Sequence, residues 1–237
     1  MREDIAMVID TNSNYSDIWE PCFTRSRKYA SGIKKYAFTD SADNLPDEII
    51  PITYDNDVSY RNQFLSCLKQ VKEKYIIYTS EDYILYDFVQ KNEIEKAATI
   101  LDNTKYSFCK FIKGPEKRKH FRDNLYEIDV NDPNFFAQQA SIWKTRDFES
   151  VFETSDSENT RMQHEPGGSK ICRQLGLTGL QYFSNTKKRG IFHYDSEIFP
   201  CIATAVVKGL WNCSEYPVEM GEVVKEFNID LNQRGWR

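Results

Sequence analysis

Two adjacent carboxylates, Glu81 and Asp82, are the strongest chemical signal in the sequence. They follow residues 75–78, an apolar run of β-branched and aromatic side chains typical of a strand buried on both faces of a parallel sheet. Carboxylate oxygens suit Mg²⁺ and Mn²⁺, and these cations also bind diphosphate oxygens. The pair therefore predicts a site that activates a leaving phosphate, with a carboxylate cap on a helix as the alternative.

A further candidate carboxylate, Glu165, lies between His164 and the glycines Gly167 and Gly168. We expect the glycines to open a helix around residues 171–175, which would let Glu165 act as a general base towards an acceptor hydroxyl. The spacing alone favours a simpler interpretation, in which the carboxylate stabilises the helix dipole.

A third group combines a histidine with cations. His193 and Asp195 are two residues apart, so in an extended segment they share a face and could complete a metal site or bind phosphate. Lys187, Lys188 and Arg189 precede them and could neutralise a diphosphate. A packed histidine and a solvated basic turn are the alternatives.

Three other side chains, Tyr15, Tyr54 and Arg61, fall near predicted strand ends, where they could contact a base or a phosphate, or only pack at the rim. The sequence contains no GxGxxG, GxxxxGK[ST] or GxSxG pattern. Dinucleotide binding, P-loop hydrolysis and serine esterase chemistry therefore have no support.

The elements that must position these residues alternate between strand and helix. Apolar runs predict strands over residues 5–9, 34–38, 49–54, 75–78, 106–112 and 135–143. Periodic stretches predict helices over 17–31, 58–74, 93–101 and 145–152, and an apolar helix within 187–211. This alternation predicts an α/β fold with a doubly wound sheet, in which ligands bind beyond the carboxyl ends of the strands. The polar residues 10–14 and 80–82 should then face one crevice.

Charge and cysteine usage narrow the class of protein. The chain has 237 residues and a net charge of −5, which argues against general nucleic-acid binding. A local basic groove stays open, since residues 113–122 contain five basic residues and a histidine, in what we expect to be a surface loop. The six cysteines form no CxxC pair, which argues against structural zinc.

The sequence also carries an expectation about location. Its start lacks the apolar stretch of a signal peptide, and no window reaches the 18 or more apolar residues of a spanning helix. We therefore expect a cytoplasmic protein with no transmembrane segment, soluble or peripheral to a membrane.

Several segments together resemble a group of bacterial and viral glycosyltransferase-like proteins with the GT-A fold, in the nucleotide-diphospho-sugar transferase superfamily. The resembling segments are residues 16–19, 75–83, 138–144, 193–196 and 205–212. The resemblance implies a single GT-A-like, Rossmann-like domain over residues 1–237, with a mixed, mainly parallel sheet. Residues 1–90 would bind the nucleotide and residues 91–237 the acceptor.

The implied activity is transfer of a sugar from a nucleotide-sugar donor to a hydroxyl of a glycan or glycoconjugate acceptor, as in polysaccharide biosynthesis. An inverting reaction needs a carboxylate base and stabilisation of the departing diphosphate. The resemblance assigns catalysis to Glu165 and Asp82, and a Mn²⁺ or Mg²⁺ ion to Asp82 and His193. It places the donor at Thr11, Asp17, Glu81 and Asp82, to which the residue patterns above add Tyr54, Arg61 and Arg189. The sugar or acceptor pocket is expected at Gln138, Gln139, Trp143 and His164.

One departure from the family pattern bears on the metal. The GT-A metal motif has two aspartates two residues apart, whereas Ser80 stands two before Asp82 here, so metal dependence stays open. Two other functions also remain: a sugar-nucleotidyltransferase, and an inactive protein that binds glycans or nucleotide sugars or acts as a scaffold. Residues 10–14 contain neither glycine nor cation, which argues against gripping a triphosphate.

Overall fold

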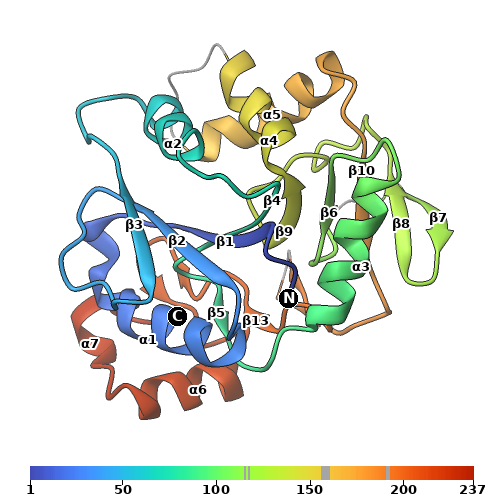
Figure 1. Ribbon diagram of the computed structural model, residues 1–237. Coiled ribbons are helices and arrows are strands. Elements are labelled where there is room, and N and C mark those ends of the chain that lie inside the picture. The colour runs from blue at the N-terminus through green and yellow to red at the C-terminus, as the bar shows by residue number, and fades with distance from the viewer. Residues whose placement is uncertain (115, 117, 156–160, 191–192) are drawn as a thin grey trace.

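A nine-stranded sheet forms the centre of the molecule in the computed structural model, which describes residues 1–114, 116, 118–155, 161–190 and 193–237, without the side chains of 161–166 (Figure 1). The strands, in their order across the sheet, are β3 (Ile49–Thr53), β2 (Lys34–Thr39), β1 (Ile5–Asp10), β4 (Tyr75–Ser80), β9 (Ser141–Lys144), β6 (Phe108–Lys110), β10 (Gly179–Tyr182), β8 (Leu125–Ile128) and β7 (Arg118–Arg122).

The strand directions place several carboxyl ends along one edge of this sheet. Strands β3, β2, β1 and β4 are mutually parallel, and β9 runs antiparallel to β4. Because β6 is antiparallel to β9, and β10 is parallel to β6, both run in the direction of β4. The chain therefore leaves β1, β4, β6 and β10 on the same side, which we call the carboxyl edge.

Helices cover both faces of the sheet. They are η1 (Ser13–Tyr15), α1 (Ser16–Tyr29), α2 (Tyr60–Leu68), α3 (Lys91–Asp102), α4 (Thr145–Thr154), α5 (Arg161–Gln174), α6 (Pro217–Glu226) and α7 (Leu231–Arg234). One core contains apolar residues of α1, α3 and α6, and the other contains those of α2, α4 and α5. Apolar strands buried on both faces explain why the sequence shows continuous apolar runs rather than alternation.

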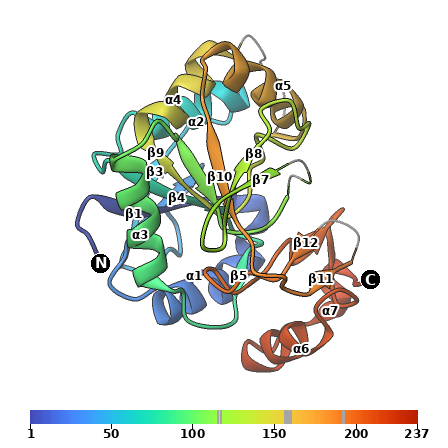
Figure 2. The same ribbon diagram turned by 90° about the vertical axis from the view of Figure 1, so that its right-hand side faces the viewer.

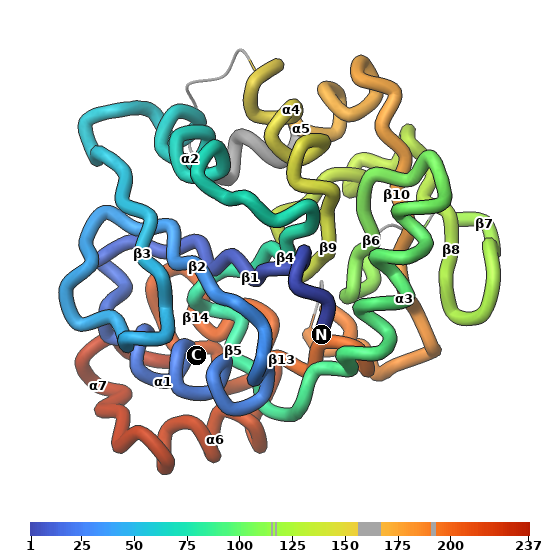
Figure 3. Tube along the Cα trace, in the orientation of Figure 1, coloured from blue at the N-terminus to red at the C-terminus, as the bar shows by residue number. Residues whose placement is uncertain are grey.

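Three short hairpins and strand pairs lie outside the main sheet. They are β5 (Ile84–Leu85) with β13 (Cys201–Ile202), β11 (Lys188–Arg189) with β12 (His193–Tyr194), and β14 (Val206–Val207) with β15 (Leu210–Trp211). Figure 2 shows β11 and β12 between β10 and α6. Figure 3 follows the C-terminal chain back to α1, which it meets through the Arg25–Glu226 ion pair at 2.6 Å.

Four sequence expectations about these elements are wrong. The described residues of 187–211 form short strands instead of an apolar helix, and residues 135–140 are a loop, so only Ser141–Lys144 pairs as a strand. The basic stretch is not a loop throughout, because Arg118–Arg122 pairs with β8. Gly167 and Gly168 lie inside α5, and a Cβ at Gly168 would stand 2.4 Å from the Phe136 ring.

No helix among the described residues is both long enough and apolar enough to cross a membrane.

Candidate active site at the carboxyl edge

A cavity of about 310 Å³ opens where β1 and β4 end. Its wall is built from the loop after β1, the residues after β4, the loop after β3 with the start of α2, and the β14 strand. The lining residues are Asp10, Thr11, Asn12, Tyr15, Tyr54, Tyr60, Gln63, Glu81, Asp82 and Val206. The two polar segments that follow the first and fourth strands thus meet in one crevice, as the sequence predicts.

The register of the sheet explains this meeting. Asp10 pairs with Ser80 across the β1–β4 ladder, and the Glu81 amide donates to the Asp10 carbonyl at 3.3 Å. Asp82 is held from two sides: its Oδ1 accepts from the Ser80 hydroxyl at 2.7 Å, and its carbonyl accepts from the Ala205 amide at 2.7 Å. Three carboxylates are therefore positioned by adjacent strand ends.

A chain of hydroxyl and amide groups supports the Asp10 carboxylate. Its Oδ2 accepts from the Tyr60 hydroxyl at 3.1 Å and from the Tyr78 hydroxyl at 3.3 Å. The Gln138 side-chain amide donates to the Tyr60 oxygen at 2.6 Å. The loop between β8 and β9 and the start of α2 are thereby tied to the strand that ends in the cavity.

The loop after β1 is fixed by a second set of bonds. The Tyr54 hydroxyl donates to the Thr11 carbonyl at 2.8 Å, and the Trp19 ring nitrogen donates to the Thr11 hydroxyl at 2.7 Å. Burial raises the pKa of Tyr54, so its hydroxyl stays a donor at neutral pH. Asp40 accepts from both the amide and the hydroxyl of Ser13 at 2.6 Å, which orders the turn that carries Tyr15.

The electrostatics of the cavity are acidic. Asp10, Glu81 and Asp82 line it, whereas no lysine, arginine or histidine is among its described lining residues. Arg234 is not among the lining residues, but its guanidinium lies 5.2 Å from the centre of the ring of Tyr15, which does line the cavity. Its Nε donates to Asp17 at 2.8 Å. A negatively charged ligand entering this cavity would need a cation with it.

The structure brings together four of the expected donor-binding residues and one expected acceptor residue. Thr11, Tyr54, Glu81 and Asp82 line the cavity, and Gln138 borders it through Tyr60.

Three other expected donor-binding residues lie away from the cavity lining, and each is engaged elsewhere. Asp17 pairs with Arg234 on the far side of the loop. Arg61 donates to the carbonyls of Phe152 at 2.7 Å and Glu153 at 2.8 Å, at the end of α4.

The third of these residues, Arg189, donates to Asp195 at 3.0 Å and to Glu219 at 2.6 Å. This joins the β11–β12 hairpin to α6. Arg189, which we expected beside the diphosphate, therefore holds the hairpin against α6 in this structure.

The remaining expected residues differ in surroundings. Trp143 is fully buried and stacks on Phe108 at 4.0 Å, so it belongs to the core rather than to a pocket. Gln139 is buried and donates to the Ile112 carbonyl at 2.8 Å. His193 Nε2 lies 3.5 Å from the Thr204 hydroxyl, next to the residue that bonds Asp82. The side chains of His164 and Glu165 fall outside the described residues.

Sequence reasoning missed Tyr60, Gln63 and Val206, and treated Asp10 only as part of a polar loop. Tyr60 and Gln63 occupy one face of the first turns of α2, so a polar start to an otherwise apolar helix was the available signal. Val206 comes from a hairpin more than a hundred residues along the chain from Asp82, and no local pattern points to it.

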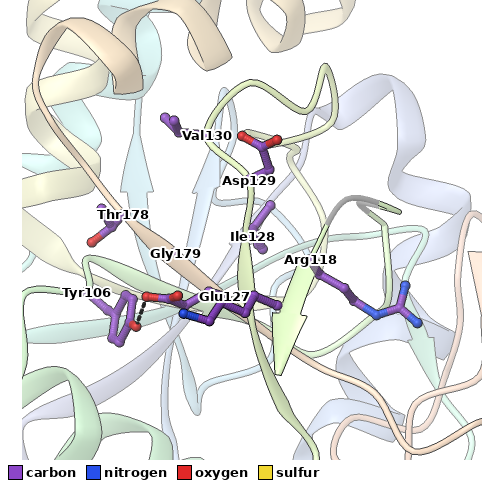
Figure 4. A pocket seen from close by; sticks show the side chains of 9 residues that line it. Tyr106, Arg118, Glu127, Ile128, Asp129, Val130, Thr178 and Gly179 are labelled. Atoms are coloured by element: carbon purple, nitrogen blue, oxygen red, sulfur yellow. Dashed lines mark hydrogen bonds between the residues drawn. The ribbon is translucent and has the colours of Figure 1, made fainter. Parts of the chain in front are cut away.

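A larger cavity of about 530 Å³ lies elsewhere (Figure 4). It sits at the amino ends of β6 and β10, on the opposite edge of the sheet, beside Tyr106, Glu127 and Thr178. The Tyr106 hydroxyl donates to Glu127 and the Thr178 hydroxyl to the Lys105 carbonyl, so both hydroxyls already have partners, and the charged Arg118, Lys119 and Asp129 complete the polar lining. The smaller, acidic cavity is the better candidate because ligands of open α/β sheets bind beyond the carboxyl ends.

Comparison with known proteins bears on the fold. The sequence matches no protein-family model and no curated protein. The structure resembles that of TarS residues 1–349 from S. aureus, with a TM-score of 0.51 and 10% identity over 81% of this chain. The alignment covers 60% of that chain, so the present chain spans less than two thirds of its length.

Two other solved structures align at lower scores. The bifunctional IspDF from Campylobacter jejuni has a TM-score of 0.47 and 9% identity, over 82% of this chain and 52% of that one. The CMP:2-keto-3-deoxy-manno-octonic acid synthetase complexed with CTP has a TM-score of 0.48 and 10% identity, over 79% and 92%. The expected fold class is confirmed by the mixed sheet with its two helical layers and by the likeness to TarS: the chain has a GT-A-like, Rossmann-like α/β fold.

Proposed function

We propose that this protein transfers a sugar from a nucleotide-sugar donor to a hydroxyl of a glycan or glycoconjugate. The observation that carries the proposal is the convergence of Asp10, Glu81 and Asp82 in one cavity at the carboxyl edge. Tyr15 and Tyr54 add rings on which a base can stack, and Asn12 adds an amide that can read its edge. A fold of this type hosts several reactions, so the site supports the proposal and the fold alone does not.

A divalent cation is part of the proposal. Among the described residues, no group of three or more His, Cys, Asp and Glu side chains is arranged to hold an ion by itself. Mg²⁺ commonly binds through one or two carboxylates together with substrate phosphates, and Glu81 and Asp82 fit that mode. The ion would neutralise the diphosphate against the acidic lining and stabilise it as a leaving group.

The acceptor side of the proposal rests on residues 91–237. Gln138 is buried and bonds the cavity residue Tyr60, and the 193–206 segment passes from β12 to the cavity wall at Val206. Glu165 remains the proposed base, by the resemblance, in an inverting reaction. A sugar-nucleotidyltransferase is the alternative; its triphosphate carries more negative charge than a diphosphate, and the described lining supplies no cationic side chain to balance it.

The decisive experiment is a thermal-shift series with UDP-, GDP-, CMP- and dTDP-sugars, each with and without Mn²⁺. A ligand that binds only the folded state raises the melting temperature by mass action, so one donor class should raise it in a Mn²⁺-dependent manner. The variant Asp82→Asn should lose the shift. The matched control Asp43→Asn removes an exposed carboxylate from the neighbouring loop after β2 and should keep it.

The outcomes separate the three functions. Donor binding without transfer or hydrolysis would point to an inactive binding protein. A shift with nucleoside triphosphates and release of pyrophosphate would point to a nucleotidyltransferase. Absence of any shift would leave the scaffold and end the proposal.

A further inference from the structure

A second charged cluster lies on the carboxyl edge, beyond the ends of β6 and β10. We call it the basic cluster and define it by Lys113, Arg118 and Lys188 with the rings of Phe183 and Tyr194. The chain reaches Lys113 three residues after β6 and Phe183 directly after β10. Lys113 and Phe183 therefore lie on the carboxyl edge, as the acidic cavity does. Arg118 begins β7 at the opposite edge, where it also lines the larger cavity, and reaches the Phe183 ring with its side chain.

Lys113 is built into the fold. Its side chain is 4% exposed, and its ammonium group lies 4.1 Å from the centre of the Tyr194 ring and 5.2 Å from that of Phe183. It donates to the Tyr194 hydroxyl at 3.0 Å and to the Glu116 carboxylate at 2.6 Å. Burying an ammonium group is costly unless it is paired, so this position requires an anion.

That anion is at present a side chain from the adjacent loop. Glu116 is 71% exposed, and its second oxygen lies 3.6 Å from the Arg118 guanidinium. The hydrogen bond from Lys113, with further attraction from Arg118 and Lys188, lowers the pKa of Glu116. Arg118 is held by stacking, 4.9 Å from the Phe183 ring and 5.2 Å from Tyr126, and Figure 4 shows it extending away from Tyr106 and Glu127.

We propose that the basic cluster is an anion-binding subsite, in which a phosphate or carboxylate group of the acceptor takes the place of the Glu116 carboxylate. The Glu116 carboxylate lies 2.6 Å from the Lys113 ammonium and 3.6 Å from the Arg118 guanidinium, and Lys188 adds a third positive charge beside the Tyr194 ring, so the cations of the cluster outnumber the single carboxylate. Glu116 is the exposed partner of this pair, so its carboxylate can leave without breaking core contacts, and the incoming anion then takes over the pairing with the buried Lys113. Arginine and lysine together provide the charge-assisted donors that a phosphate binds.

The position of the subsite fits an acceptor. Two strand spacings separate β4 from β6 in the sheet, about 10 Å, and the 193–206 segment links Tyr194 of the cluster to Val206 of the cavity wall. A glycan carrying an acidic group could therefore bind here while presenting a hydroxyl to the donor. This assignment of the acceptor class rests on the proposed function, whereas the anion site itself does not.

The alternative is that Glu116 only anchors its loop to Lys113. The two views differ in what Glu116→Gln does. If the carboxylate occupies a ligand site, its neutral analogue should tighten anion binding by about fivefold, because a competing charge is removed. If it is only an anchor, anion affinity should stay unchanged.

The test is calorimetric titration of the full chain with glycerol 1-phosphate, with inorganic phosphate and with glycerol as the uncharged comparison. We expect the phosphate monoester to bind at least as tightly as inorganic phosphate, and glycerol not to bind. Arg118→Gln should weaken monoester binding by about tenfold, and the exposed Lys188→Gln should weaken it without any effect on the core. Arg122→Gln removes the same charge from the same strand, away from Glu116, and should change affinity less than about twofold.

Melting temperatures of the variants guard against misfolding, with Lys188→Gln as the variant least able to disturb packing. Binding of inorganic phosphate alone, or an unchanged monoester affinity in Glu116→Gln and Lys188→Gln, would overturn the proposal. The nucleotide-sugar titration on the same samples keeps the two proposals apart. Monoester binding without nucleotide-sugar binding would sink the transferase and leave the anion site standing.

Discussion

The acidic cavity and the basic cluster share one edge of the sheet but balance their charges differently. In the cavity, Asp10 accepts hydrogen bonds from the hydroxyls of Tyr60 and Tyr78, and Asp82 accepts one from the Ser80 hydroxyl. In the basic cluster, the buried ammonium of Lys113 is met by a carboxylate. The difference teaches that the acidic cavity needs an added cation before it can bind an anionic ligand. The basic cluster needs only to release the Glu116 carboxylate.

The largest expected effect would break the cavity and spare the cluster. Replacing Glu81 and Asp82 together with Gln and Asn removes the proposed ligands of the divalent cation, so Mn²⁺-dependent binding of the nucleotide sugar should fall by about 100-fold. Monoester binding at the basic cluster should change little. Calorimetry on one protein sample measures both, and a parallel loss at both places would mean that the two regions are not separate sites.

A second prediction compares the supporting hydroxyls. Tyr60→Phe removes a donor from Asp10 and an acceptor from Gln138, both buried, and should lower the free energy of unfolding by about 1–2 kcal/mol. Tyr194→Phe leaves Lys113 its Glu116 partner and should cost less, below about 1 kcal/mol. Urea unfolding gives both values, and equal losses would contradict the comparison.

Raising the ionic strength should weaken ligand binding at the basic cluster more than at the acidic cavity. Screening lengths shrink from about 30 Å at 0.01 M to about 8 Å at 0.15 M salt, and exposed charges are screened more than buried ones. Glu116 and Lys188 are exposed, whereas Glu81 is buried, so anion binding at the cluster should weaken several-fold and Mn²⁺ binding at the cavity less. Titrations at the two salt concentrations test this order.

The smallest expected effect concerns pH. The hydrogen bond from Lys113 holds the pKa of Glu116 below its usual 4.5. The ion pair between Lys113 and Glu116 is therefore fully formed above pH 4.5, and it is lost as the pH falls through the lowered pKa. Sulfate keeps its charge over this range, so its affinity for the cluster should rise by about threefold as the pH drops below that value. The rise should be missing in Glu116→Gln; a rise of equal size there would assign it to another group.

The strand framework and the meeting of two polar segments were predictable from the sequence. Residues 75–78 and 5–9 are continuous apolar runs, and parallel strands buried on both faces produce such runs. Once both strands are placed in one parallel sheet, their carboxyl ends must fall together. Thr11, Glu81 and Asp82 follow from this geometry alone.

The partners of long charged side chains were not predictable in the same way. Arg61 bonds carbonyls 91 and 92 residues away, and Arg189 bonds a carboxylate 30 residues away. The partners of such side chains depend on how the helices pack in three dimensions, and the spacing of nearby residues in the sequence does not reveal this. The strand Arg118–Arg122 was also hidden by its basic composition, although Asp123, with a φ of 46° in the turn to β8, gives a turn signal beside Asn124.

The order of strands leaves β3 and β7 at the two ends of the sheet. Pro51 interrupts the amide row of β3, and β7 presents Arg118, Lys119, His120 and Arg122 among its five residues. An edge strand is a template on which another chain can add, and proline or concentrated like charge prevents this. Two copies of this chain meeting edge to edge would therefore repel or fail to pair, which limits growth of the sheet into aggregates.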